Sequence, residues 1–190
     1  MDRAWLNKIN REARINPEKA LKKLHSMVKL DLALRDLDPK KAFRTSEFKR
    51  DREIRGACIF CYGMSRRIGQ QVWVYPIEES DFDFVAAWEV GDRRHFAPTQ
   101  LKEVVPKHRN PNTSLQSVID TLVDYRASEQ LTVALHLNRQ GRFDPNEITM
   151  PALKLAALWV FSAVSEDQIR WFLVGNMLEE PTRTLFDYPV

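Results

Sequence analysis

Two aspartates and a Gln-x-Lys triplet are the residues of this chain whose types and spacing point to chemistry. Asp81 and Asp83 are two positions apart, and so are Gln100 and Lys102. Alternate side chains of a β-strand lie on the same face of the sheet, so each pair shares a face if its segment is extended. Carboxylate and amide oxygens suit Mg²⁺ or Mn²⁺, which keep several waters and also bind phosphate oxygens. The lysine would orient or deprotonate an attacking water and neutralise charge growing on the phosphorus. These residues therefore predict a site for phosphodiester hydrolysis.

The two pairs lie in segments with the residue pattern of neighbouring β-strands. β-branched and aromatic residues favour strands at three places, residues 72–75, 82–90 and 94–105. The dipeptide Gly91-Asp92 favours a turn between the second and third of these strands. If the two strands pair through this turn, the acidic pair comes to lie beside Gln-x-Lys. Pro98 interrupts the third strand, so we expect an edge position or a bulge there.

A helix is predicted over residues 46–67, ending before Gly69. Its expected inward stripe is Ala57, Phe60, Cys61 and Met64. One turn before Ala57 stands Glu53, a carboxylate in line with an apolar face, and a buried charge costs several kcal/mol unless it is paired or binds a cation. Three explanations remain open. Glu53 pairs with a buried Arg or Lys, or it faces a polar site at the edge of the core, or the helix dipole and water satisfy it.

The remainder of the chain predicts more helices and strands of the same domain. Ser114 caps a helix that runs to Tyr125. Residues 131–138 alternate as a strand, with His136 and Asn138 on its more polar face. The apolar run 155–164 fits either a strand or a helix, and we interpret it with 169–174 as a hairpin around residues 165–167. The expected fold is α/β, with a mixed central sheet flanked by helices.

The N-terminal residues 1–44 read as a helical arm with a basic face. Asn16 and Pro17 favour a helix start. The exposed face would carry Lys19, Lys22 and Lys23, which either lie along a phosphate backbone or form an ordinary solvated surface. Pro39 favours a break after residue 38. We therefore divide the chain into a basic helical arm, 1–44, and a main domain, 45–190.

Composition excludes several classes of protein. The chain has 190 residues, 44% of them hydrophobic and 29% charged, which is enough to bury a core without cross-links. No run approaches the roughly 20 apolar residues of a membrane span, and residues 1–14 carry charges where a signal peptide is apolar. Two cysteines make no disulfide framework. We expect a cytoplasmic protein without a membrane partner, and the net charge of +3 does not by itself diagnose nucleic acid.

The other short motifs in the sequence give little evidence of a catalytic or metal site. Cys58 and Cys61 have C-x-x-C spacing but lie on a helix face among apolar neighbours, so core cysteines are the favoured interpretation. The stretch Gly63-Met64-Ser65 begins like a nucleophile elbow, but Arg67 stands where the final glycine belongs. Neither a phosphate-binding glycine loop nor a dinucleotide fingerprint is present in the sequence.

The order helix, three strands, helix, strand, with Asp83 in the second strand and Gln100-Leu101-Lys102 in the third, resembles the restriction-endonuclease-like PD-(D/E)xK nucleases. The resemblance covers residues 46–138. It implies that Asp83 is the principal metal ligand, with Asp81 as the competing choice. Gln100 takes the position of the second acid, which is also a glutamine in some members. Lys102 matches the catalytic lysine, and Glu53 matches the helix glutamate that many members add.

The resemblance implies a metal-dependent nuclease that uses Mg²⁺ or Mn²⁺ to hydrolyse DNA, with RNA not excluded. Lys107 and Arg109, in the loop after the third strand, are further candidates for phosphate contacts beside Lys19, Lys22 and Lys23, and His136 and Asn138 are candidates for lining the groove. A homodimer is compatible with this interpretation. The alternative is a catalytically inactive protein of the same fold that binds nucleic acid or another protein.

Overall fold

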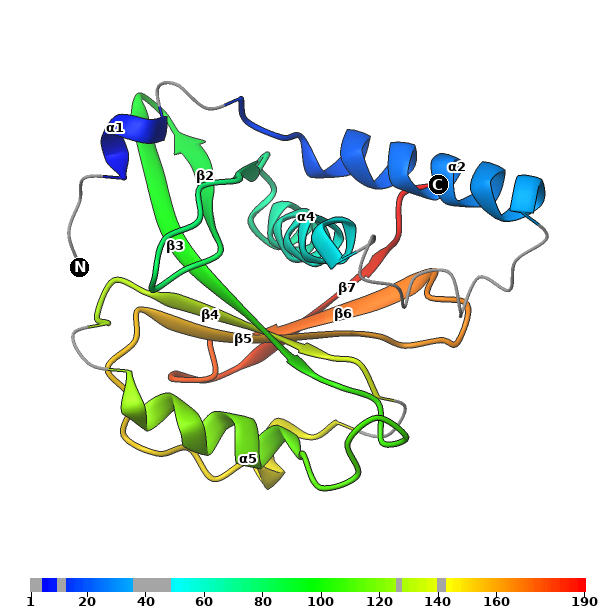
Figure 1. Cartoon of the computed structure of the whole chain (residues 1–190). Helices are drawn as coiled ribbons and strands as arrows, with labels where there is room; N and C mark the ends of the chain where they lie inside the picture. Colours follow the sequence, from blue (N-terminus) through cyan, green and yellow to red (C-terminus); the bar gives the residue numbers. More distant parts are fainter. Residues whose placement is uncertain (1–4, 10–12, 36–48, 126–127, 140–142) are drawn as a thin grey trace.

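The computed structural model describes residues 5–9, 13–35, 49–125, 128–139 and 143–190 (Figure 1). Its helices are α1 (Leu6–Ile9), α2 (Pro17–Arg35), α4 (Lys49–Ile68) and α5 (Leu115–Asp120), with 3₁₀ turns η2 (Thr121–Asp124) and η3 (Pro145–Glu147). Its strands are β1 (Trp73–Tyr75), β2 (Phe84–Val90), β3 (Arg93–Val104), β4 (Thr132–Leu137), β5 (Ala157–Ala163), β6 (Arg170–Gly175) and β7 (Thr182–Asp187).

The strands form one mixed seven-stranded sheet in the order β1-β2-β3-β4-β5-β6-β7. The pairs β3–β4 and β4–β5 are parallel, and the remaining neighbours are antiparallel. Parallel neighbours need a crossover, and α5 with η2 provides the one between β3 and β4. The coarse prediction of an α/β fold with a mixed sheet flanked by helices is confirmed.

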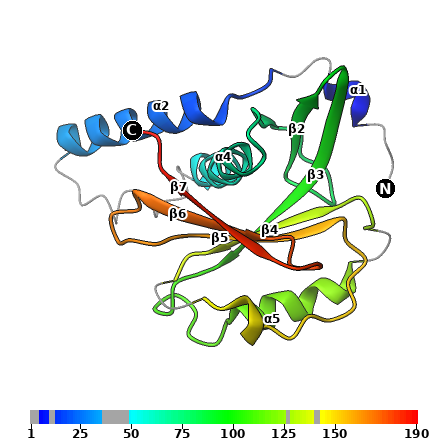
Figure 2. The ribbon, with the colours of Figure 1, turned by 180° about the vertical axis from the view of Figure 1, so that it is seen from behind.

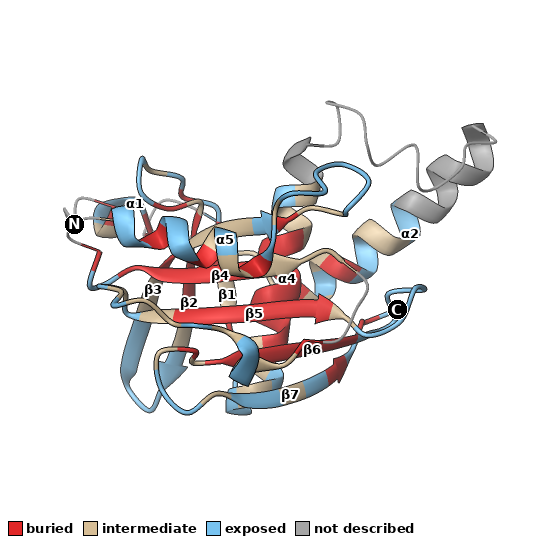
Figure 3. Cartoon of the chain, turned by 90° about the horizontal axis from the view of Figure 1, so that it is seen from below, coloured by how far each residue is buried: buried red, intermediate tan, exposed pale blue. Residues whose placement is uncertain are grey.

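Helices cover both faces of the strongly twisted sheet. In Figures 1 and 2, α4 and α2 lie on one side of the sheet and α5 lies on the other. Each face has its own hydrophobic core, and Figure 3 shows that β4, β5 and β6 are buried along most of their length. Strands covered on both faces are apolar at consecutive positions, which explains why the run 155–164 lacks the alternation of a half-exposed strand.

Most of the predicted elements match the structure, one needs correction and one strand was missed. The helix predicted at 46–67 is α4, with residues 46–48 outside the described part of the chain, and Ser114 caps α5 as expected. The run 155–164 with 169–174 forms the β5–β6 hairpin. The second face of β4 was expected to be the more polar one, but Thr132 and Ala134 are buried there, and Ala134 packs in the same hydrophobic core as α4. The strand β7 was not predicted.

The described part of the N-terminal arm packs on the main body. Ile15 forms a bridge with Val74 of β1, and Leu21 of α2 is fully buried with residues of α4. The predicted boundary after residue 38 lies outside the described residues, so the division into 1–44 and 45–190 stays a prediction.

Candidate active site

Asp83 and Gln100 meet where β2 begins beside β3. Phe84 pairs with Thr99, and β3 continues from there to Val104 with β4 as its partner. Asp83 stands one residue before this first pair, and its backbone N–H donates to the carbonyl of Thr99 at 3.0 Å. Its Oδ2 accepts from Gln100 Nε2 at 2.7 Å and from the backbone N–H of Leu101 at 2.6 Å. The structure therefore brings together the predicted acid and the predicted amide.

Burial is the main influence on the Asp83 carboxyl. The side chain is half-buried, and this desolvation raises its pKa above the ordinary range of aspartate. The hydrogen bond from Leu101 acts in the opposite direction, since it stabilises the carboxylate. The charges of Glu78 and Glu53 raise the pKa further, and the charge of Lys102 lowers it. Both Glu53 and Lys102 thus lie within electrostatic reach of Asp83.

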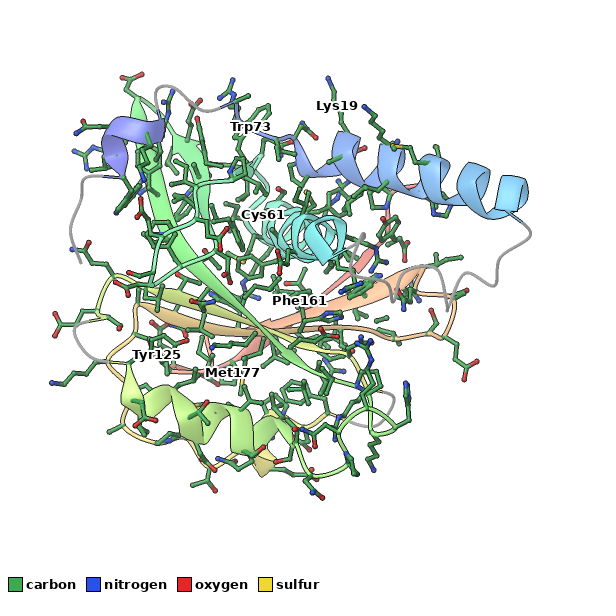
Figure 4. All side chains as sticks on the ribbon, in the orientation of Figure 1. Lys19, Cys61, Trp73, Tyr125, Phe161 and Met177 are labelled. Atoms are coloured by element: carbon green, nitrogen blue, oxygen red, sulfur yellow. The ribbon has the colours of Figure 1, made fainter. Side chains whose placement is uncertain are left out.

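Lys102 shares a face of β3 with Gln100. Leu101, between them, points toward α4, because a Cβ added to Gly56 of that helix would lie 2.8 Å from Leu101 Cδ2. The alternation of the strand therefore directs Gln100 and Lys102 to the α5 side of the sheet. Lys102 is half-buried, with Nζ 5.5 Å from the ring centroid of Tyr125. Figure 4 labels Tyr125 at the end of the α5–η2 helix.

Glu53 is exposed on α4, so the inward stripe of that helix does not bury a carboxylate. The stripe itself is confirmed at Ala57, Phe60 and Cys61, which are buried, while Met64 is half-buried. Because the side chain is exposed, the buried charge that the three explanations address does not occur, and the charge of Glu53 acts on Asp83 by raising its pKa.

Asp81 lies in a turn and not in a strand, so the alternation expected to align it with Asp83 does not apply. Glu79 and Phe82 form an isolated bridge, and Asp81 stands between them with an exposed side chain that accepts from Ser80 Oγ at 3.1 Å. Among the described residues, no hydrogen bond or ion pair joins Asp81 to Asp83 or Gln100. Asp83 is thus the acid that the structure pairs with Gln-x-Lys.

Sequence reasoning missed Glu78. The bridge between Glu79 and Phe82 is antiparallel, with Glu79 N–H donating to the Phe82 carbonyl at 2.9 Å. The next positions outward in this register are Glu78 and Asp83, which explains why Glu78 raises the pKa of Asp83. A cluster of polar residues at 78–81 signals a turn, but the register that places Glu78 opposite Asp83 depends on tertiary packing.

The predicted nucleic-acid-binding lysines and arginine are exposed, and they form two separate sets. Lys19, Lys22 and Lys23 lie on α2, where Lys22 Nζ is 3.5 Å from Glu18 Oε1. Lys107 and Arg109 lie in the loop between β3 and α5. Figures 1 and 2 place α2 and this loop on opposite sides of the sheet, and Figure 4 labels Lys19 on the outer side of α2.

His136 and Asn138 make contacts within the protein. The imidazole of His136 stacks on Phe161, with ring centroids 4.9 Å apart. Burial, and secondarily the charge of Arg55, lower the pKa of His136 to about 3, so the ring is neutral near pH 7 and offers no charge to a phosphate. Asn138 Nδ2 donates to Glu103 Oε1 at 2.7 Å. These contacts give no support to the groove role predicted for the pair.

The cysteines belong to the core, as expected. Cys58 and Cys61 are fully buried and free, and burial raises the pKa of Cys58 to about 12 and that of Cys61 well above the ordinary value. Neither thiol forms a nucleophilic thiolate at neutral pH.

Oxygen atoms of Asp83 and Gln100 are suited to a hydrated Mg²⁺ or Mn²⁺ ion, which needs only one or two carboxylates from a protein. Because Gln100 donates through Nε2, its Oε1 is the amide atom available to a cation. Within residues 5–9, 13–35, 49–125, 128–139 and 143–190, no group of three or more His, Cys, Asp and Glu side chains is arranged to hold a metal by itself. Any cation here would therefore rely on water and substrate for most of its ligands.

The chain matches no family model, and no similar curated protein or solved structure is found. Among the helices in the described residues, none is long and apolar enough to cross a membrane.

Proposed function

We propose that the protein is a metal-dependent nuclease of the restriction-endonuclease-like PD-(D/E)xK type, acting on DNA. The observation that carries this proposal is the pairing of Asp83 with Gln100 where β2 begins beside β3, with Lys102 on the same face of β3 as Gln100. The element order α4, β1, β2, β3, α5, β4 also supports it, because three antiparallel strands are followed by a crossover to a fourth strand parallel to the third.

In this proposal each side chain has a defined role. Asp83 and Gln100 Oε1 would hold Mg²⁺ or Mn²⁺, which when bound supplies Lewis-acid polarisation of a phosphate oxygen. Lys102 donates a hydrogen bond to the scissile phosphate or to the attacking water, and its positive charge offsets negative charge developing on the phosphate. Glu53 adds negative charge at the margin of the site, where it favours cation binding. Asp81 in its exposed turn is not assigned to the metal.

Cleavage of supercoiled plasmid DNA tests the proposal directly. With Mg²⁺ or Mn²⁺ the unaltered protein should nick or linearise the plasmid, and Asp83→Asn and Lys102→Met should each lower the rate by roughly 10² or more, because each removes a charged group from the reacting centre. Lys154→Met, at an exposed lysine outside the site, is the matched control and should cut normally. Parallel reactions on single-stranded RNA decide between the two substrates.

A second function is favoured by one specific observation. Asp83 Oδ2 already accepts two hydrogen bonds, and Gln100 brings no negative charge for a cation. This arrangement also suits a catalytically inactive protein that binds nucleic acid. No cleavage by the unaltered protein, with DNA affinity that weakens with salt but survives EDTA and Asp83→Ala, would establish the binding function and reject the nuclease. A cytoplasmic location and a homodimer stay predictions in either case.

A further inference from the structure

The short helix α1 packs against the turn that precedes β2. Trp5 is buried just ahead of this helix, and its ring meets the ring of Phe82 edge-on, with centroids 6.0 Å apart at 76°. It meets Phe96 of β3 in the same way, at 6.2 Å and 75°. Phe82 immediately precedes Asp83, so a single indole contacts both the segment that carries the acid and the strand that carries Gln-x-Lys. Figure 1 shows α1 beside β2 and β3.

A second contact from α1 reaches the other end of the same turn. Lys8 Nζ forms an ion pair with Glu79 Oε1. Glu79 is bridged to Phe82 through its backbone N–H. Trp5 and Lys8 therefore contact the two residues that close the turn, one on each side.

The contribution of Trp5 comes from ring packing. Its indole Nε1 is the buried side-chain nitrogen for which no hydrogen-bond partner is found among the described residues. A buried donor without a partner costs about 1–3 kcal/mol, so this N–H does not stabilise the contact. A phenyl ring at position 5 would keep edge contacts with Phe82 and Phe96 and would remove the donor. Trp5→Phe is thus a conservative variant that separates packing from the polar group.

We propose that Trp5 and Lys8 are positioning residues for the Asp83 carboxylate. By holding the Glu79–Phe82 turn against β3, they keep Asp83 Oδ2 within hydrogen-bond distance of the Leu101 N–H and of Gln100. This positioning concerns the geometry of the carboxylate and is independent of whether the site hydrolyses phosphodiesters. Its importance for catalysis alone rests on the proposed function.

The amide proton of Leu101 reports on this geometry without any substrate. The hydrogen bond from this amide to Asp83 Oδ2 slows exchange of the amide proton with solvent, so hydrogen exchange in the full-length protein at one fixed pH measures whether the carboxylate is held in place. The protection of Leu101 is compared with that of the other amides of β3. Trp5→Ala should abolish the protection of Leu101 relative to those amides, Lys8→Met should reduce it, and Trp5→Phe should retain it.

Two controls separate positioning from general loosening. Asn7→Ala changes an exposed residue of α1 and should leave the relative protection of Leu101 intact. Ile119→Val trims α5 in the same hydrophobic core as Trp5 and lowers stability at a position outside the turn, so it should also leave the relative protection intact. Unchanged relative protection in Trp5→Ala, or its loss in Ile119→Val, would overturn the proposal. Because no cleavage is measured, failure of the nuclease proposal would not affect this result.

Discussion

At the scale of single residues, the uncharged amide of Gln100 limits the negative charge at the candidate site. Gln100 Nε2 donates to a carboxylate whose pKa burial already raises. A neutral donor at this position lets Asp83 remain half-buried without adding a further negative charge to those of Glu78 and Glu53. A carboxylate there would bind a cation more strongly, but it would strain the site when no cation is bound.

Gln100→Glu should therefore destabilise the metal-free protein by roughly 1–3 kcal/mol at neutral pH, since two carboxyl groups would share one hydrogen-bond position. The pKa values of these two carboxyl groups in the folded state would exceed those in the unfolded chain. At a pH between the two sets of values, the folded protein therefore holds protons that the unfolded chain has lost. The penalty is therefore absent below the ordinary carboxyl pKa and grows as pH rises through the raised values. Thermal unfolding between pH 4 and pH 8, with and without Mn²⁺, measures this effect.

Gln116→Glu is the matched control. Gln116 Nε2 also donates to an aspartate, Asp120 Oδ1, at 2.7 Å, and to the carbonyl of Thr149 at 2.8 Å. The loss of stability in Gln116→Glu should be insensitive to Mn²⁺. The same dependence on Mn²⁺ in the two variants would contradict the assignment of a cation site to Asp83 and Gln100.

At the scale of elements, α4 approaches the sheet through its glycines. A Cβ added to Gly63 would lie 2.8 and 2.9 Å from ring atoms of Phe186 in β7, and one added to Gly56 would lie 2.8 Å from Leu101 in β3. These two glycines are seven positions apart and so lie on the same face of the helix. Close packing there sets the distance between α4, which carries Glu53, and the strand that carries Lys102.

Gly63→Ala should destabilise the protein by about 1–3 kcal/mol, because the rigid ring of Phe186 cannot yield without moving β7. The sign of this change in the free energy of unfolding shows whether the position is crowded, because glycine to alanine in an uncrowded helix stabilises by about 1 kcal/mol. Chemical denaturation measures the change. Ile68→Ala, at an exposed position at the end of α4, serves as the control and should stay within about 0.5 kcal/mol. A stabilised Gly63→Ala would show that α4 does not pack closely on β7.

The elements near the candidate site could be predicted because their signals are local. The β2–β3 hairpin follows from alternating residues around Gly91, which has a φ of 55° that favours glycine, and α5 follows from its Ser114 cap. The strand β7 gave no such signal, because most of its side chains are exposed and Phe186 is its one buried residue. The turn position of Asp81 depends on the bridge between Glu79 and Phe82, which no short-range pattern reveals.

At the scale of the whole molecule, the arrangement of layers separates the two basic sets. Lys102 and Tyr125 lie on the α5 side of the sheet, and the loop with Lys107 and Arg109 joins β3 to α5 on that same side. The basic residues of α2 lie beyond α4 on the opposite side. Sequence spacing alone did not distinguish the two sets, because their separation follows from the way the helices cover the sheet.

A nucleic acid bound at the candidate site should therefore contact the loop and not α2. Replacing Lys107 and Arg109 together by Gln should weaken DNA binding and reduce the dependence of log Kd on log salt by up to about 2, because each removed cation leaves one phosphate without a protein counter-charge. Replacing Lys19, Lys22 and Lys23 by Gln should change this slope little. Affinity measured between 50 and 200 mM salt, concentrations over which such interactions are strongly weakened, tests the pair of variants. The reverse result would place the binding face on α2.

The order of the strands has a consequence for how the chain acquires its structure. Each strand lies beside the strand that precedes it in sequence, so the sheet can grow one neighbour at a time with mostly short loop closures. Helix α4 is an exception, because Arg67 donates to Thr182 and Thr184 of β7, and Gly63 rests on Phe186. The face of α4 that packs on β7 therefore stays uncovered until β7, the last strand in the sequence, has been synthesised. During synthesis, this apolar surface is what a chaperone would have to shield.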